Sequence, residues 1–332
     1  MAACLAPLAS IYGWAATTRY ARAAPYRSRL PVICAGNFTA GGTGKTPLVL
    51  HLCEHLLAAG RHPVALTRGY GGRHAGPHWV ASTDSADDVG DEALLLARIV
   101  PTLIARDRAA GARVVEEMPG PARVLVMDDG LQNASLAKDL AIVMIDAVRG
   151  LGNRLVMPAG PLRAPLGFQL GLAGAIVVNG PVTGNGVAEW LRHQFDGPVL
   201  RSTTSPAGDV SWLRGQHTVA WAGIASPQRF FTMLEAQGAQ LAETVTFRDH
   251  QRLTEADAVR LLTLAGRHQA RLVSTEKDFA RLKGMTGKLA DLAAATRVLQ
   301  IKLSFAEPDA SRLAALVDGA LKGHDERGAR SA

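Results

Sequence analysis

The chain has 332 residues, of which 48% are hydrophobic and 20% charged, a composition typical of a globular protein with a buried core. Its formal net charge of +7 favours anionic partners, such as phosphorylated molecules or an anionic membrane surface. Nucleic acid is not an expected partner, because the chain has no lysine- or arginine-rich run and only 5% aromatic residues. Nothing in the sequence calls for a required protein partner.

Residues 1–28 form a segment of their own. The stretch Ala2–Thr18 carries no charge, and Arg19, Arg22, Arg27 and Arg29 follow it. About 17 uncharged residues lie at the lower limit for crossing a bilayer, and a secretory signal carries its charge before the apolar stretch rather than after it. We therefore expect a membrane-associated helix with its arginines at the lipid headgroups. A helix packed on the domain is the alternative.

After this segment, short apolar runs alternate with helical patterns, which predicts an α/β fold with a mostly parallel sheet flanked by helices. The expected strands are Val32–Ala35, Val64–Thr67, Thr102–Ala105, Val124–Met127, Ala141–Ile145, Ala175–Val178, Pro198–Ser202, Thr218–Ala222, Leu241–Thr246 and Arg271–Ser274. The expected helices are Thr46–Ala59, Asp91–Ile99, Arg106–Glu117, Pro227–Gln237, Glu255–Arg267 and Ala310–Leu321.

The glycine- and proline-containing stretch Thr203–Gln216 is the expected seam between two domains. It divides the chain into a core domain, residues 29–205, and a smaller C-terminal α/β domain, residues 206–322. Residues 323–332 are polar and small, and we expect them to form a disordered tail.

A glycine-rich loop links the strand Val32–Ala35 to a helical pattern that opens at Thr46. Strand, glycine loop and helix are the context of a P-loop, in which backbone N–H groups face the phosphates of a nucleotide. Lys45 is expected to reach the β- and γ-phosphates and Thr46 to ligate Mg²⁺. Thr39 stands where the usual pattern has glycine. The residues expected to bind the nucleotide are Thr39, Ala40, Gly41, Gly42, Thr43, Gly44, Lys45 and Thr46.

ATP is favoured over GTP as the nucleotide. Proteins that bind guanine nucleotides carry an Asn/Thr-Lys-x-Asp signature. The segment Thr275-Glu276-Lys277-Asp278 resembles this signature but has the wrong spacing.

Two adjacent carboxylates, Asp128 and Asp129, end the apolar strand Val124–Met127. P-loop proteins hold the acid that supports Mg²⁺ at this position. Adjacent carboxylates repel each other unless they are solvated or neutralised, so a purely structural role is unusual. We therefore expect Asp128 and Asp129, together with Thr46, at a magnesium site; an exposed turn is the alternative.

Three further candidates have competing structural explanations. Asp91 opens an apolar helix, where an acidic residue acts as a helix cap or takes part in catalysis. His250 follows Asp249 in a loop after a strand, which suits either an acid–base group or a structural histidine. Arg68 lies in a glycine-rich turn after another strand, which suits either anion recognition or a flexible turn.

Taken together, these segments resemble the tetraacyldisaccharide 4'-kinase (lipid A 4'-kinase) family, in the same order and at similar separations, roughly from Leu5 to Phe305. The segments are Gly36-Asn37 with Gly41-Gly42-Thr43-Gly44-Lys45-Thr46-Pro47, Arg68-Gly69-Tyr70-Gly71, Val89-Gly90-Asp91-Glu92, Asp128-Asp129-Gly130-Leu131-Gln132, Arg149-Gly150 with Pro158-Ala159-Gly160-Pro161-Leu162-Arg163, Asp249-His250 and Thr275-Glu276-Lys277-Asp278. The family's loop begins with Ser or Thr, as Thr39 does here. Asn133 replaces the family's usual histidine.

The resemblance implies an ATP- and Mg²⁺-dependent kinase that phosphorylates the 4'-hydroxyl of a tetraacylated glucosamine disaccharide 1-phosphate, giving lipid IVA. It implies a place on the cytoplasmic face of the bacterial inner membrane, peripheral or held by the N-terminal helix. Asp91 maps to the catalytic base and His250 to its partner, while Lys45 and Arg68 would neutralise charge on the transferred group. The alternatives are a kinase of a soluble sugar or nucleotide and a nucleotide-switched ATPase.

Overall fold

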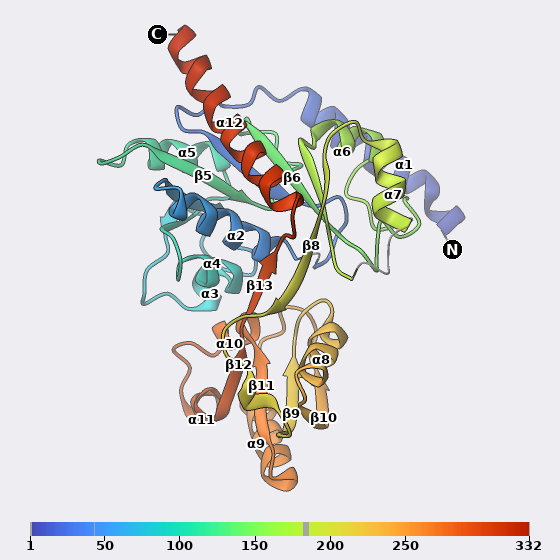
Figure 1. Cartoon of the computed structure of the whole chain (residues 1–332), viewed down its shortest axis with the longest axis vertical. Helices are drawn as coiled ribbons and strands as arrows, with labels where there is room; N and C mark the ends of the chain where they lie inside the picture. The colour runs from blue at the N-terminus through green and yellow to red at the C-terminus, as the bar shows by residue number, and fades with distance from the viewer. Residues whose placement is uncertain (1, 43, 182–185, 332) are drawn as a thin grey trace.

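The computed structural model describes residues 2–42, 44–181 and 186–331. Within these residues the chain forms a nine-stranded sheet and a four-stranded sheet, each flanked by helices. Figure 1 shows the two as separate lobes, the larger sheet above the smaller one. The expected α/β class with a mostly parallel sheet is confirmed.

The larger lobe is built on a sheet of strand order β13-β8-β7-β6-β1-β5-β2-β4-β3. The strands from β8 to β4 run parallel, and β3 and β13 pair antiparallel at the two edges. Their bounds are β1 Val32–Gly36, β2 His62–Thr67, β3 His78–Trp79, β4 Thr102–Ile104, β5 Arg123–Asp128, β6 Leu140–Asp146, β7 Ala175–Asn179, β8 Val199–Pro206 and β13 Ile301–Ser304.

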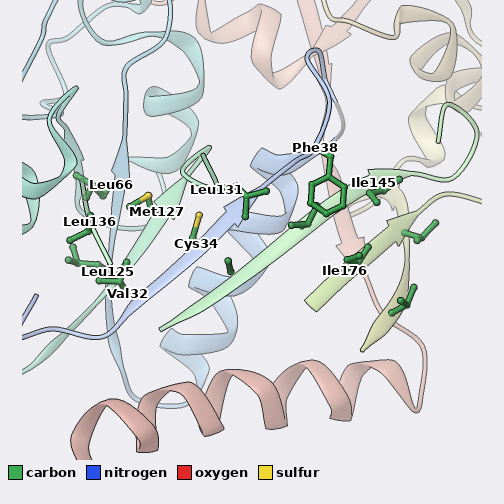
Figure 2. Packing of buried hydrophobic residues seen from close by; sticks show 14 of the residues in the cluster. Val32, Cys34, Phe38, Leu66, Leu125, Met127, Leu131, Leu136, Ile145 and Ile176 are labelled. Carbon is green, nitrogen blue, oxygen red and sulfur yellow. The ribbon is translucent and has the colours of Figure 1, made fainter. Parts of the chain in front are cut away.

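Both faces of this sheet are buried, which explains why β1 reads as a continuous apolar run. Val32 and Cys34 pack in one layer, visible in Figure 2, and Ile33 and Ala35 pack in the other. The first layer is covered by α5 (Arg108–Glu116), α6 (Leu166–Leu172) and α7 (Gly186–Gln194), and the second by α2 (Lys45–Ala58), α4 (Asp91–Leu96) and α12 (Asp309–Ser331). The short helix α3 (Ala86–Val89) precedes α4.

The smaller lobe is a four-stranded parallel sheet of order β10-β9-β11-β12. Its strands are β9 His217–Ala222, β10 Gln240–Thr246, β11 Arg271–Thr275 and β12 Thr296–Leu299. One face is covered by α8 (Pro227–Ala236), the other by α9 (Glu255–His268) and α11 (Gly287–Ala295). The short helix α10 (Glu276–Ala280) leaves the end of β11 and points toward the larger lobe.

The chain returns to the larger lobe after β12, which differs from the expected division at residue 206. Strand β13 pairs antiparallel with β8 in the large sheet. Helix α12 buries Leu313, Val317 and Leu321 against the same sheet. Residues 301–331 therefore belong to the larger lobe, because their apolar face is needed to cover it.

The expectation of a disordered tail from residue 323 is also corrected, since α12 continues to Ser331. His324 Nδ1 lies 3.2 Å from Asp139 Oδ2, and Arg327 forms an ion pair with the same carboxylate. These contacts fix the polar end of the helix to the turn before β6.

Helix α1 (Ala2–Ala21) lies beside α6 on the larger lobe. Its C-terminal part packs there, because the Tyr20 ring meets the Phe168 ring edge-on with centroids 5.3 Å apart. Its other side carries exposed apolar side chains, with Ile11 62% and Trp14 67% exposed. Within the part of the chain that the structure describes, none of the helices has both the length and the apolar character needed to span a membrane.

Candidate active site

The sheet brings the ends of three central strands to one edge. Ala35 at the end of β1 pairs with Asp128 of β5, and Leu66 of β2 pairs with Met127 of β5. The loops that follow parallel strands all leave from the carboxyl edge, which is where open α/β sheets bind their ligands. The glycine-rich loop, the paired carboxylates and Thr67 therefore meet at one place.

The glycine-rich loop is curled at this edge as a P-loop requires. Gly41 and Gly44 have φ values of 103° and 87°, in the left-handed region that favours glycine. The Asn37 side chain holds the curl, since its Nδ2 donates to the carbonyl oxygens of Thr39 at 2.6 Å and Gly41 at 3.3 Å. Helix α2 then begins at Lys45, so its N-terminus faces the loop. Of the predicted loop residues, Thr43 lies outside the described residues.

The P-loop lysine lies close to the acidic pair. Lys45 Nζ is 3.7 Å from Asp129 Oδ1. Arg163 forms a two-pronged ion pair with the same carboxylate, with Nη1–Oδ1 at 2.6 Å and Nη2–Oδ2 at 3.1 Å. Burial would raise the pKa of Asp129, but the charges of Lys45 and Arg163 hold it below its usual value. Asp129 is therefore ionised and already shared between two cations.

Asp128 has a different environment. Its side chain is buried, and its Oδ2 accepts a hydrogen bond from Thr67 Oγ1 at 3.4 Å. Its Oδ1 is buried without a hydrogen-bond partner among the described residues. Burial and the negative charges of Glu92 and Asp129 raise the pKa of Asp128 to about 7. An unpartnered carboxylate oxygen beside a phosphate loop fits a hard cation such as Mg²⁺.

Asp91 and His250, 159 residues apart in sequence, are brought together across the lobes. His250 Nδ1 lies 3.1 Å from Asp91 Oδ2. Arg281, at the end of α10, contacts the same oxygen through Nε at 2.8 Å and Nη2 at 2.6 Å. Burial would raise the pKa of Asp91, but the His250 hydrogen bond and the charges of Lys277 and Arg281 lower it to about 2. The carboxylate is thus ionised.

A cavity of about 620 Å³ opens between this pair and the P-loop. His250 lines the cavity with Lys45, Asp128 and Asp129, whereas Asp91 lies behind His250 and lines a neighbouring cavity. Arg68, predicted to contact the transferred group, is exposed on the cavity wall, and Asn133 also lines it. The remaining wall comes partly from α1, through Tyr12, Ala16, Arg19 and Tyr20.

A second cavity, of about 230 Å³, lies on the other side of the P-loop. Gly44 and Thr46 form one wall, and Ile224, Phe230, Met233 and Leu299 of the smaller lobe form the apolar wall opposite. Asn179 at the end of β7 supplies a polar amide beside them. A mostly apolar pocket with one amide next to a phosphate loop suits a nucleobase.

Sequence reasoning left several residues of the site without a role. Glu92, Arg163, Arg281, Lys277 and Asn179 all contact or line it. Glu92, Arg163 and Lys277 lie inside the segments that carry the family resemblance, so the signal was present. Arg281 follows the last of these segments by three residues, and Asn179 was visible only as a polar residue ending an apolar strand.

The phosphate-binding loop faces both a nucleoside-sized pocket and a larger cavity with a hydrogen-bonded carboxylate and imidazole. This is the organisation of a P-loop kinase. The family model described as tetraacyldisaccharide-1-P 4'-kinase matches residues 1–322. The chain belongs to that family, as its sequence predicted.

Comparison with individual relatives supports the same family assignment. A tetraacyldisaccharide 4'-kinase of Paramagnetospirillum magneticum is 45% identical over 307 residues, covering 92% of this chain and 91% of the relative. That of Afipia carboxidovorans is 45% identical over 282 residues, covering 84% and 82%. The structure of LpxK from Aquifex aeolicus, described as in complex with ATP, has a TM-score of 0.74, covers 96% of this chain and 99% of its own, and is 22% identical. The fold is therefore shared along nearly the whole chain, and the predicted kinase activity is confirmed.

The two carboxylates should respond oppositely to pH in metal-free protein. The pKa of Asp128 is about 7 in the folded protein and about 4 in the unfolded chain. Ionising Asp128 therefore lowers the stability of the folded protein as the pH rises from about 4 to about 7. Asp128→Asn should therefore raise the melting temperature relative to wild type more at pH 8 than at pH 5, measured in EDTA.

The matched control is Asp129→Asn. The pKa of Asp129 is lowered in the folded protein, so its ionised form stabilises the fold above about pH 4, and this stabilisation is lost as the pH falls. Asp129→Asn should therefore melt at a lower temperature than wild type at pH 8. A difference between Asp128→Asn and wild type that is the same at pH 5 and pH 8 would contradict the assignment of a costly buried carboxylate.

Proposed function

We propose that this chain transfers the γ-phosphoryl group of ATP to the 4'-hydroxyl of a tetraacylated glucosamine disaccharide 1-phosphate, giving lipid IVA. The observation that carries the proposal is the meeting of two cavities at Lys45, one suited to a nucleoside and one to a large amphiphilic acceptor. Family membership supplies the identity of the acceptor.

On the nucleotide side, the triphosphate lies along the P-loop with Lys45 at the β- and γ-phosphates. The base enters the apolar pocket beside Asn179. Asp128, Asp129 and Thr46 are the residues that would hold Mg²⁺. Bound there, the ion would neutralise charge on the phosphate oxygens. The ion pairs of Asp129 with Lys45 and Arg163 fix the orientation of its carboxylate.

On the acceptor side, the larger cavity combines cationic and apolar walls. Arg19, Arg68 and Arg106 line it, and so do the aromatic rings of Tyr20 and Phe168. A lipid that carries a phosphate and acyl chains matches both walls, whereas a soluble sugar would leave the apolar wall uncovered. This composition favours the lipid over a soluble acceptor.

The Asp91–His250 pair acts as the acid–base unit in this proposal. The sequence-based expectation made Asp91 the base and His250 its partner. Because His250 faces the acceptor cavity and Asp91 lies behind it, we assign contact with the 4'-hydroxyl to His250 Nε2. Asp91 then orients the ring and stabilises the imidazolium that forms when the hydroxyl proton is taken. Arg68 binds the anionic groups of the acceptor.

We also propose that α1 places the enzyme on the cytoplasmic face of the inner membrane. Its exposed apolar residues are Leu8, Ile11, Tyr12 and Trp14. Residues of the same helix line the acceptor cavity. A helix that dips its apolar side into the headgroup region would therefore bring the lipid directly to the cavity mouth. The net charge of +7 favours an anionic surface.

The direct test is incubation with ATP, Mg²⁺ and a tetraacyldisaccharide 1-phosphate, followed by mass analysis of the lipid. One added phosphate on the lipid is the expected result. Lys45→Ala should abolish the transfer while the protein remains folded, because Arg163 still pairs with Asp129. ADP formation without any phosphate on the lipid would instead favour a soluble acceptor or a nucleotide-switched ATPase.

Substitution of the acid–base pair should affect turnover more than nucleotide binding. His250→Gln and Asp91→Asn should each lower kcat by about 10²–10⁴-fold, with little change in the KM for ATP, because proton transfer acts in the transition state. The double variant should lose no more than the worse single variant if the two residues act as one unit. A change confined to the KM for ATP would make them binding residues.

The membrane proposal is tested on the exposed face of α1. Trp14→Glu should weaken binding to vesicles that contain anionic lipid, measured by sedimentation, because a charge replaces an inserted ring. Val259→Glu, at an exposed apolar residue of α9 in the smaller lobe, is the matched control and should bind as wild type does. Equal binding by all three proteins would leave α1 as a packing helix only.

A further inference from the structure

The two cavities share only part of their walls. Among the described residues, four line both: Gly42, Lys45, Glu92 and Lys277. A phosphoryl group passing from nucleotide to acceptor must cross the point where the two cavities meet. Lys45 supplies a positive charge there from the larger lobe, and Lys277 supplies one from the smaller lobe.

Local structure fixes Lys277 in this position. Strand β11 ends at Thr275, which caps α10: Thr275 Oγ1 accepts from Asp278 N at 3.1 Å and donates to Asp278 Oδ2 at 2.7 Å. Lys277 therefore lies in the first turn of a capped helix. Arg281, one turn further on, anchors the same helix to Asp91. The side chain of Lys277 is only 20% exposed.

Among the residues that the structure describes, three groups lie close to the Lys277 ammonium. Its Nζ lies 3.2 Å from Glu92 Oε1, 3.7 Å from Asp249 Oδ1 and 3.1 Å from His250 Nε2. Burial would lower the pKa of Lys277, but the charges of Glu92, Asp91 and Asp249 raise it above its usual value. The amine therefore carries its proton at neutral pH.

The tautomer of His250 follows from these contacts. An ammonium group has no acceptor, so His250 Nε2 must accept from Lys277, and Nδ1–H then donates to Asp91. Lys277 thus covers the ring nitrogen that the proposed function assigns to the acceptor hydroxyl. A bound triphosphate brings more negative charge than Glu92 and Asp249 provide.

We propose that Lys277 is a catalytic residue that contacts the γ-phosphoryl group from the smaller lobe, opposite Lys45, and leaves His250 Nε2 when it does so. The inference rests on the proposed function. In the step itself, the bond from phosphorus to the ADP oxygen breaks and a bond to the acceptor oxygen forms. The hydroxyl proton passes to His250 Nε2, while Lys277 keeps its protons and neutralises charge on the transferred oxygens.

The test compares Lys277→Met, Lys277→Ala and Lys277→Arg with wild type, in the presence of ATP, Mg²⁺ and the lipid acceptor. ADP formation and lipid phosphate are measured in parallel. Lys277→Met should lower kcat by about 10²–10³-fold, whereas Kd for a non-hydrolysable ATP analogue should change far less. Lys277→Arg should retain more activity than Lys277→Met. Lys283→Met, at an exposed lysine of the same lobe, is the matched control and should match wild type.

A second measurement separates catalysis from a structural role. Added ethylammonium should restore part of the turnover of Lys277→Ala without raising its melting temperature. A free cation can replace the charge of the Lys277 side chain, but it cannot link the two lobes as a covalently attached side chain does. Near-normal kcat in Lys277→Met overturns the inference. A lowered melting temperature together with no rescue by the amine overturns it as well, since Lys277 would then only hold the lobes together.

Failure of the proposed function would be seen separately. If wild type forms ADP but no phosphorylated lipid, the acceptor assignment is wrong. ADP formation still reports loss of the γ-phosphoryl group, so the comparison of Lys277 variants with wild type decides the role of Lys277 in either case.

Discussion

The site depends on a buried carboxylate whose charge is balanced from the other lobe. Asp91 lies in the larger lobe, while His250, Arg281 and Lys277, which lower its pKa, all belong to the smaller lobe. Leaving such a carboxylate uncompensated costs on the order of 3–5 kcal/mol. That electrostatic requirement holds α10 against α4, and with it places the imidazole on the wall of the acceptor cavity.

Each lobe also presents a lysine that is neutralised by carboxylates at the junction of the two cavities. Lys45 lies beside Asp129, and Lys277 lies beside Glu92 and Asp249. Two ammonium groups facing one point need counter-charge when no phosphate is present. If a triphosphate binds there as we propose, it supplies that charge itself, so binding would exchange protein ion pairs for contacts to the ligand.

The sequence was sufficient for the central sheet and the phosphate loop because their signals are local. β1 is a buried apolar run followed by glycines that need positive φ, and Asp128 and Asp129 directly end a second such run. Contacts between residues that are far apart in the sequence could not be predicted from the residues alone. The pairing of β13 with β8 joins segments about 100 residues apart. The polar end of α12 is held by Asp139, and nothing in the composition of α12 indicates this contact. Lys277 lies in a segment that carries the family resemblance, but its contacts with Glu92, Asp249 and His250 join different segments and so gave it no role in advance.

The double crossing between the lobes has a mechanical consequence. The chain leaves the larger lobe through β8 and comes back through β13, and these strands pair antiparallel, Ile301 with Pro206 through Ser304 with Thr203. Two connections that are hydrogen-bonded to each other restrict the movement of the smaller lobe more than a single linker would. Any movement of the two lobes relative to each other therefore has to bend this ribbon. A ribbon of this kind would bring α10 back to the same position against α4 after such a movement.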